Sequence, residues 1–309
     1  MIAPMSDVHP GSDPAPTSER VPVEGGDLHL LRFGSPEAAP ARTVLAVHGI
    51  TASGAAWPAV AAALPEDWSL VAPDLRGRGR SRGVEGPAGL LRHAADVCLV
   101  AEALDPEHTG GLVLAGHSMG AYVAALAARA RPELFSHVVL VDGGVPLPVP
   151  EGVDPDAVLQ ATLGPALERL SQTYDSVEDY VAFFRQHPAL GPHWDDTVES
   201  YVRYDALETP DGIRSRAVEE AVRTDGRDLL TTGRELDDAL RGSSLPTHLL
   251  VAPLGMFGQA PGLLPAEAVA AYDAELDHLQ VETVAGVNHY TILFDATAAR
   301  RVAEVITGA

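Results

Sequence analysis

The feature that most constrains the fold is a segment in which an apolar strand, a glycine-flanked serine turn and an apolar helix follow each other directly. Residues 112–115 are the strand, residues 116–120 read Gly-His-Ser-Met-Gly, and residues 121–128 are an alanine-rich helix. A strand, a G-x-S-x-G turn and a helix in this order predict a nucleophile elbow, a turn so tight that its serine takes a strained backbone conformation. The segment therefore predicts that Ser118 stands exposed at the end of a buried strand.

Composition and charge exclude several classes of function. The formal net charge of the 309-residue chain is −22, which disfavours binding to nucleic acids and to anionic membranes. All 21 basic residues are arginine, so Schiff-base chemistry and the lysine of a phosphate-binding loop are excluded. The single cysteine, Cys98, lies in an apolar-periodic run and predicts a buried helical residue. We expect neither a metal ion nor a cofactor.

The periodicity of apolar residues divides the chain into a core and an insertion. From residue 27 to residue 142, short β-rich runs alternate with helical ones, which is typical of an α/β fold with a mostly parallel, doubly wound sheet. A proline-rich break at 146–150 precedes mainly helical sequence, and the alternation resumes at residue 247. We therefore expect three parts: a flexible tail at 1–20, a core built from 21–145 and 247–309, and a helical cap at 146–246.

Three further motifs accompany the elbow in a specific order. Residues 48–50 (His-Gly-Ile) follow one predicted strand, the arginine-rich run at 74–81 follows the next, and Asn288-His289 lies near the C-terminus. In this order and spacing the motifs resemble the α/β-hydrolase family, in particular its serine hydrolases with a cap domain. The resemblance covers the chain from residue 27 onward apart from the cap. It implies a catalytic serine, a histidine base and backbone donors to an oxyanion.

The chemistry of acyl transfer and the family pattern assign roles to these motifs. A serine hydroxyl needs an imidazole to take its proton, and His289 fits the family order of nucleophile before base. Negative charge on the attacked carbonyl oxygen needs preorganised donors, and we expect the backbone N–H groups of Ile50 and Met119 to supply them. Gly49 lets its loop approach the serine, and His117 supports the elbow.

The acidic member of the triad departs from the common family pattern. The family usually places an aspartate after the strand predicted at 247–252, but residues 253–262 contain no carboxylate. Asp142, which ends the strand after the elbow helix, occupies an alternative family position, so we assign it as the acid that orients the imidazole. A turn-capping role for Asp142 stays open. So do a dyad without an acid and three rival carboxylates: Asp273, Asp277 and Asp295.

These residues predict a serine hydrolase that cleaves a carboxylic ester, lactone or thioester of a small molecule through an acyl-enzyme on Ser118. Carbon–carbon bond hydrolysis, cofactor-free perhydrolysis, and a small-molecule receptor with slow or no turnover stay open. From the charge we expect a neutral, partly apolar substrate and no nucleic-acid or membrane partner. We expect a monomer or a homodimer. We further expect a cytoplasmic protein, because no signal-peptide pattern and no bilayer-spanning apolar run is found.

Overall fold

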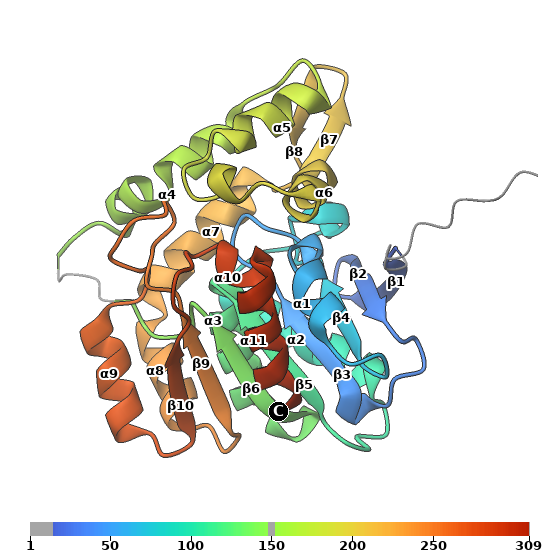
Figure 1. Cartoon of the computed structure of the whole chain (residues 1–309), viewed down its shortest axis with the longest axis vertical. Coiled ribbons are helices and arrows are strands. Elements are labelled where there is room, and N and C mark those ends of the chain that lie inside the picture. Colours follow the sequence, from blue (N-terminus) through green and yellow to red (C-terminus); the bar gives the residue numbers. More distant parts are fainter. Residues whose placement is uncertain (1–14, 148–151, 309) are drawn as a thin grey trace, which may run out of the picture.

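The computed structural model describes residues 15–147 and 152–308, which form an α/β core beneath a mainly helical cap (Figure 1). An eight-stranded sheet crosses the core in the order β1-β2-β4-β3-β5-β6-β9-β10. Strand β2 is antiparallel to both of its neighbours, and every pairing from β4 to β10 is parallel. The predicted fold class is confirmed. The strands are β1 (Thr17–Val23), β2 (Gly26–Gly34), β3 (Thr43–Val47), β4 (Ser69–Pro73), β5 (Leu112–His117), β6 (Phe135–Val141), β9 (Thr247–Val251) and β10 (Leu279–Thr283).

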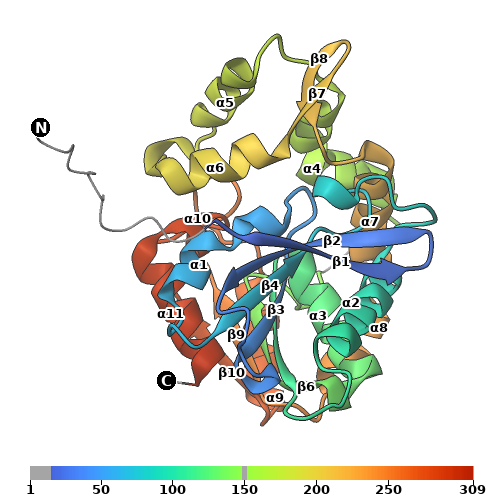
Figure 2. The same cartoon turned by 90° about the vertical axis from the view of Figure 1, so that its right-hand side faces the viewer.

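Helices cover both faces of the sheet, as the buried, apolar strands of a parallel sheet require. One face carries α1 (Pro58–Ala63) and α11 (Ala296–Thr307). The other face carries α2 (Leu90–Leu104), α3 (Met119–Ala130), α8 (Gly233–Arg241) and α9 (Ala266–Glu275). Figure 2 shows α1 and α11 on one side of the sheet and α2, α3 and α8 on the other. Cys98 is buried on α2, as predicted, and none of the described helices has the length and apolar character needed to cross a membrane.

The cap lies over one edge of the sheet (Figure 1). Its elements are α4 (Pro155–Ser171), α5 (Val177–Arg185), α6 (Asp196–Asp205), β7 (Ala206–Thr209), β8 (Gly212–Ser215) and α7 (Glu219–Thr231). The β7–β8 hairpin was not predicted, because its strands are only four residues long. Helix α8 falls within the segment expected to form the cap, but it packs on α3 in the core. Its buried Leu236 and Leu240 join the same apolar cluster as α3.

The expectation of a flexible tail over residues 1–20 is wrong for residues 17–20. They begin β1, which pairs with β2 from Thr17 opposite Arg32 to Val23 opposite Gly26. The polar composition of this strand hides it in the sequence, since Val21 is its one buried residue. Residues 1–14 of the expected tail and residues 148–150 of the expected proline-rich break lie outside the described residues.

The parallel strands bring the candidate residues to one place. The carboxyl ends of parallel strands meet at the same edge of a sheet. The loops after β3, β5, β6, β9 and β10 therefore converge beneath the cap, and the short helix α10 (Thr291–Phe294) follows the last of them. Ser118, His289, Asp142 and the two expected oxyanion donors all lie in, or directly beside, these loops.

Candidate active site

Ser118 occupies the sharp turn between β5 and α3. Its backbone φ of 54° and ψ of −125° are in a region that non-glycine residues rarely adopt, so the turn is strained. A β-carbon on Gly116 would lie 2.2 Å from the carbonyl oxygen of Gly120, and one on Gly120 would lie 2.1 Å from that of Val47. The elbow therefore requires glycine at both positions. The Ser118 N–H donates to the Val141 carbonyl (2.9 Å), which anchors the elbow to β6.

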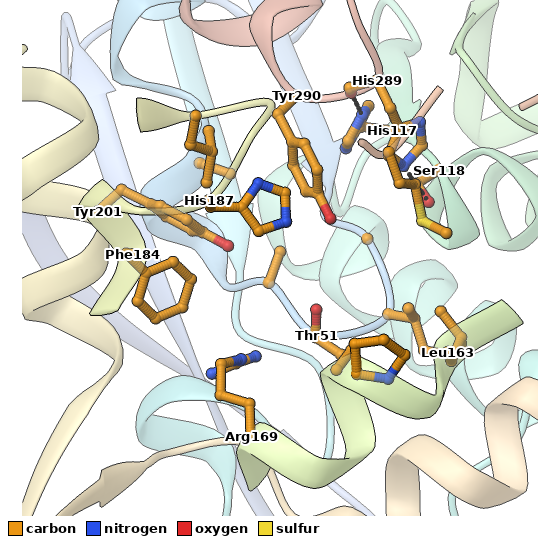
Figure 3. Close-up of a pocket in the computed structure, with 18 of the residues that line it drawn as sticks. Thr51, His117, Ser118, Leu163, Arg169, Phe184, His187, Tyr201, His289 and Tyr290 are labelled. Atoms are coloured by element: carbon orange, nitrogen blue, oxygen red, sulfur yellow. Dashed lines mark hydrogen bonds between the residues drawn. The ribbon is translucent and has the colours of Figure 1, made fainter. Parts of the chain in front are cut away.

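Ser118, His289 and Asp142 form a continuous hydrogen-bonded series, although they come from three separate loops. The Ser118 hydroxyl lies 3.0 Å from His289 Nε2, and His289 Nδ1 lies 2.6 Å from Asp142 Oδ2. His289 is 3% exposed and Asp142 is fully buried. With Nδ1–H donating to the carboxylate, Nε2 is left to accept a proton from the hydroxyl. Figure 3 shows Ser118 and His289 together at one end of a pocket.

Asp142 is oriented by the end of β9, the strand after which the family usually places its acid. The Asp142 backbone has a φ of 46°, which aspartate tolerates better than most residues. Its N–H donates to the Leu250 carbonyl (2.7 Å), and its Oδ1 accepts the N–H of Ala252 (3.0 Å). Farther along, the Leu254 carbonyl accepts the N–H of His289 (3.0 Å). The end of β9 therefore positions the acid, and the carboxylate-free loop that follows it positions the histidine, both through backbone groups.

The rival carboxylates lie elsewhere. Asp295 caps α11 by accepting the backbone N–H groups of Thr297 and Ala298. Asp273 and Asp277 are exposed to solvent, on α9 and before β10. Within the part of the chain that the structure describes, Asp142 is the carboxylate that contacts the imidazole of His289.

The expected oxyanion donors flank Ser118. Ile50 lines the pocket beside it, and Met119 is the first residue of α3. Among residues 15–147 and 152–308, neither backbone N–H has a hydrogen-bond acceptor, so both are free to bind an oxygen atom. A β-carbon on Gly49 would lie only 3.1 Å from the Ser118 β-carbon, so this loop approaches the serine as closely as glycine allows. The N-terminal end of α3 adds its positive dipole at the same point.

Two histidines beside the site act as neutral supports. The His117 Nε2–H donates to the His289 carbonyl (2.7 Å), and burial together with the charge of His289 lowers the pKa of His117 well below its usual range. The His48 Nδ1–H donates to the Gly49 carbonyl (2.7 Å), and His48 Nε2 accepts the N–H of Leu75 (3.0 Å). Burial lowers the pKa of His48 to about 4. Both side chains are therefore uncharged at neutral pH and hold the two loops in place.

A buried arginine of the run at 74–81 connects the Ile50 loop to the cap. Arg78 is fully buried, its Nε donates to the Ile50 carbonyl (2.9 Å), and its Nη2 forms an ion pair with Asp225 Oδ2 (2.5 Å) on α7. Asp225 also accepts from His93 Nε2 (2.9 Å). Burial acts to raise the pKa of the Asp225 carboxyl, but the charges of Arg78 and His93 outweigh burial and hold this pKa below its usual value. Arg78 thus fixes the loop of one expected oxyanion donor against the cap.

Replacing Arg78 by methionine is expected to lower the free energy of unfolding by about 3–5 kcal/mol, because Asp225 stays buried without its cation. Denaturant unfolding of the variant and of the wild type measures the difference. The double variant Arg78→Met/Asp225→Asn is expected to regain part of the loss, since it buries no unpaired charge. Additive losses in the two single variants and the double variant would show that the two residues do not act as a pair.

A cavity of about 150 Å³ extends from Ser118 toward the cap. Its walls are mostly apolar, and Phe183, Phe184 and Tyr201 are the cap aromatics among them. Figure 3 shows Phe184 and Tyr201 on the side of the pocket away from Ser118. The other cap aromatics contact other protein groups instead of the cavity. The Tyr204 hydroxyl, for example, donates a hydrogen bond to Asp74 Oδ2 (2.6 Å) and links α6 to the core. The cavity therefore lies between the core and the cap and suits a small organic molecule.

Known hydrolases resemble this chain in sequence and in fold. The alpha/beta hydrolase family profile matches residues 44–305. A 2-(acetamidomethylene)succinate hydrolase from Mesorhizobium japonicum is 27% identical over 273 residues, which are 88% of each chain. Lipase LipV from Mycobacterium tuberculosis is 41% identical over 121 residues, 39% of this chain and 43% of the lipase, so the alignment spans less than half of that protein. The solved thioesterase domain from the curacin biosynthetic pathway shares the fold, with a TM-score of 0.75 at 23% identity over 96% of this chain and 100% of that domain.

Proposed function

Because the chain belongs to the alpha/beta hydrolase family, we propose that it is a serine hydrolase that cleaves an ester-like bond of a small molecule. The observation that carries the proposal is the hydrogen-bonded series from Ser118 through His289 to Asp142 at the end of a mostly apolar cavity. The unused N–H groups of Ile50 and Met119 beside the serine support it. The bond is a carboxylic ester, lactone or thioester, since each presents a carbonyl carbon to the serine.

In the proposed reaction, His289 Nε2 takes the proton of the Ser118 hydroxyl as its oxygen attacks the carbonyl carbon. The oxygen of the tetrahedral intermediate accepts hydrogen bonds from the N–H groups of Ile50 and Met119, and Asp142 stabilises the imidazolium. His289 then gives its proton to the leaving alcohol or thiol, and the acyl group stays on Ser118. Water, deprotonated by His289, attacks the acyl-enzyme in the same way and releases the carboxylic acid.

A fluorophosphonate probe tests this proposal, because it reacts with an activated serine and not with an ordinary one. We expect the wild type to be labelled at Ser118, as located by peptide mass spectrometry, and Ser118→Ala to remain unlabelled. Ser136→Ala, which removes an exposed serine hydroxyl on β6, is the matched control and is expected to be labelled like the wild type.

Two results would count against the proposal. Folded wild-type protein that resists labelling would contradict the activated serine. Labelling at Ser118 without turnover on any member of a panel of esters, lactones and thioesters would instead favour a small-molecule receptor.

A further inference from the structure

Among the described residues that line the cavity, one side chain is formally charged: Arg169, in the last turn of α4. Arg169 is 6% exposed, and Figure 3 shows it on the side of the cavity away from Ser118. No carboxylate is among the described residues that line the cavity. The chain has 43 acidic and 21 basic residues. Arg169 pairs with the buried Asp205 (3.3 Å), but Asp205 does not line the cavity, so the described lining itself presents a cation and no acid. The sign of this local charge points to an anionic ligand group.

The guanidinium of Arg169 forms hydrogen bonds through one nitrogen, Nη1, and its Nε–Nη2 edge stays available to a ligand. Its Nη1 donates to the Tyr180 hydroxyl (2.8 Å) and to Asp205 Oδ2 (3.3 Å), two residues that do not line the cavity. Within the described part of the chain, Nε and Nη2 have no hydrogen-bond acceptor. These two nitrogens form one side of the planar fork, and their spacing matches the two oxygens of a carboxylate.

Further hydrogen-bond donors line the same cavity. His187 Nδ1 accepts the N–H of Ala189 (3.2 Å), so the proton of the neutral ring is on Nε2. Burial and the charge of Arg169 lower the pKa of His187, which keeps the ring neutral. The hydroxyls of Tyr201 and Tyr290 have no partner among the described residues, and both side chains line the cavity (Figure 3). Three neutral side chains that can donate hydrogen bonds therefore line the cavity together with Arg169.

We propose that Arg169 binds a carboxylate of the substrate through its Nε–Nη2 edge, so that the preferred substrates are esters that carry a second, ionised carboxylate group. The inference rests on the proposed hydrolase function and names its substrate class. A purely structural role explains the contacts of Nη1 with Tyr180 and Asp205, but it leaves the second edge without a purpose. A phosphate dianion fits less well, because a single cation faces the cavity. The neutral substrate expected from the net charge is replaced by a partly apolar anion.

Matched pairs of esters test the proposal. One member of each pair is a p-nitrophenyl half-ester of a linear dicarboxylic acid, and the other is the p-nitrophenyl alkanoate with a methyl group in place of the carboxylate. We expect the best half-ester to exceed its neutral partner by about 10- to 100-fold in kcat/KM, chiefly through a lower KM. Esters of hydroxy acids form a second arm, which distinguishes a carboxylate on the alcohol portion from one on the acyl portion.

Removing the cation is expected to abolish the preference. Because Arg169→Met alone leaves Asp205 buried without its partner, the double variant Arg169→Met/Asp205→Asn is measured beside it. Both variants are expected to lose the preference while they keep turnover of the neutral esters. Arg203→Gln, which removes an exposed arginine of α6 paired with Glu199, is the matched control and is expected to retain it.

The outcomes separate this inference from the proposed function. Equal rates on both members of every pair, or an equal loss on both in the Arg169 variants, would overturn the carboxylate site while labelling of Ser118 leaves the hydrolase standing. If Ser118 is not labelled, calorimetric titration of Ser118→Ala with glutarate and adipate tests the site alone. Binding that disappears on Arg169→Met/Asp205→Asn supports the site, and absence of binding overturns it.

Discussion

Ser118→Ala and His289→Ala are each expected to reduce kcat on a p-nitrophenyl ester by about 10⁵- to 10⁶-fold, and the double variant by no more than either single variant. The reason is that the two groups act as one unit. A serine without its base remains a poorly nucleophilic hydroxyl, and a base without the serine has no proton to take. The activity that remains is expected to come from the backbone donors and from substrate binding, neither of which the substitutions touch.

Steady-state kinetics of the three variants measures this coupling, with Ser136→Ala and His193→Ala as controls. Both control residues are exposed and lie outside the cavity, so wild-type rates are expected. A His289→Ala variant that keeps more than about a hundredth of the wild-type kcat would remove His289 from the role of general base. A further proportional loss in the double variant would show that the two groups act independently.

The sequence predicts best where a single strong pattern specifies the local structure. Strand β9 (Thr247–Val251) ends only one residue before the bound predicted at 247–252, because it is a short apolar run set off by polar and proline-containing segments. The turn at Ser118 follows from its two glycines and from the strand and helix around it. The convergence of residues 142 and 289 follows in turn, because parallel strands end at one edge of the sheet.

Local sequence patterns do not predict the contacts between the cap and the core. Arg78 lies in a core loop and its partner Asp225 lies on the cap helix α7, far away in the sequence. No local sequence pattern specifies such a partner. Residues 17–20 form the start of β1 because they pair with β2, although their own polar side chains do not predict a strand. Helix α8 shows the same effect, because its apolar face packs on α3 although its neighbours in the sequence belong to the cap.

The position of Arg169 on helix α4 is a sequence signal for a buried charged residue. The buried or half-buried residues of α4 include Leu159, Leu163 and Ala166, spaced by three or four positions, and Arg169 continues this face. A charged residue on the apolar face of a cap helix is costly to bury unless it is paired or binds a ligand. Such a residue indicates a binding site more specifically than the acidic surface of the cap does.

Asp142→Asn is expected to lower kcat by about 10⁴-fold while leaving the fold intact, because asparagine has nearly the same shape. An amide NH₂ facing Nδ1 favours the tautomer with the proton on Nε2, so His289 then presents a donor to the Ser118 hydroxyl and cannot take its proton. The Ala252 N–H still meets an oxygen if the amide places its carbonyl at Oδ1, which orients the NH₂ group toward the imidazole. The loss is therefore catalytic and not structural.

The matched control is Asp277→Asn, which changes an exposed carboxylate just before β10 and is expected to leave kcat unchanged. Circular dichroism and thermal unfolding establish that both variants are folded, and steady-state kinetics compares them. Near-wild-type turnover by Asp142→Asn would remove Asp142 from the proposed triad and favour a serine–histidine dyad, since the other carboxylates of residues 15–147 and 152–308 make no contact with the imidazole. A large loss in Asp142→Asn alone is expected, because the end of β9 supplies Ala252 as a donor to the carboxylate and no acid of its own.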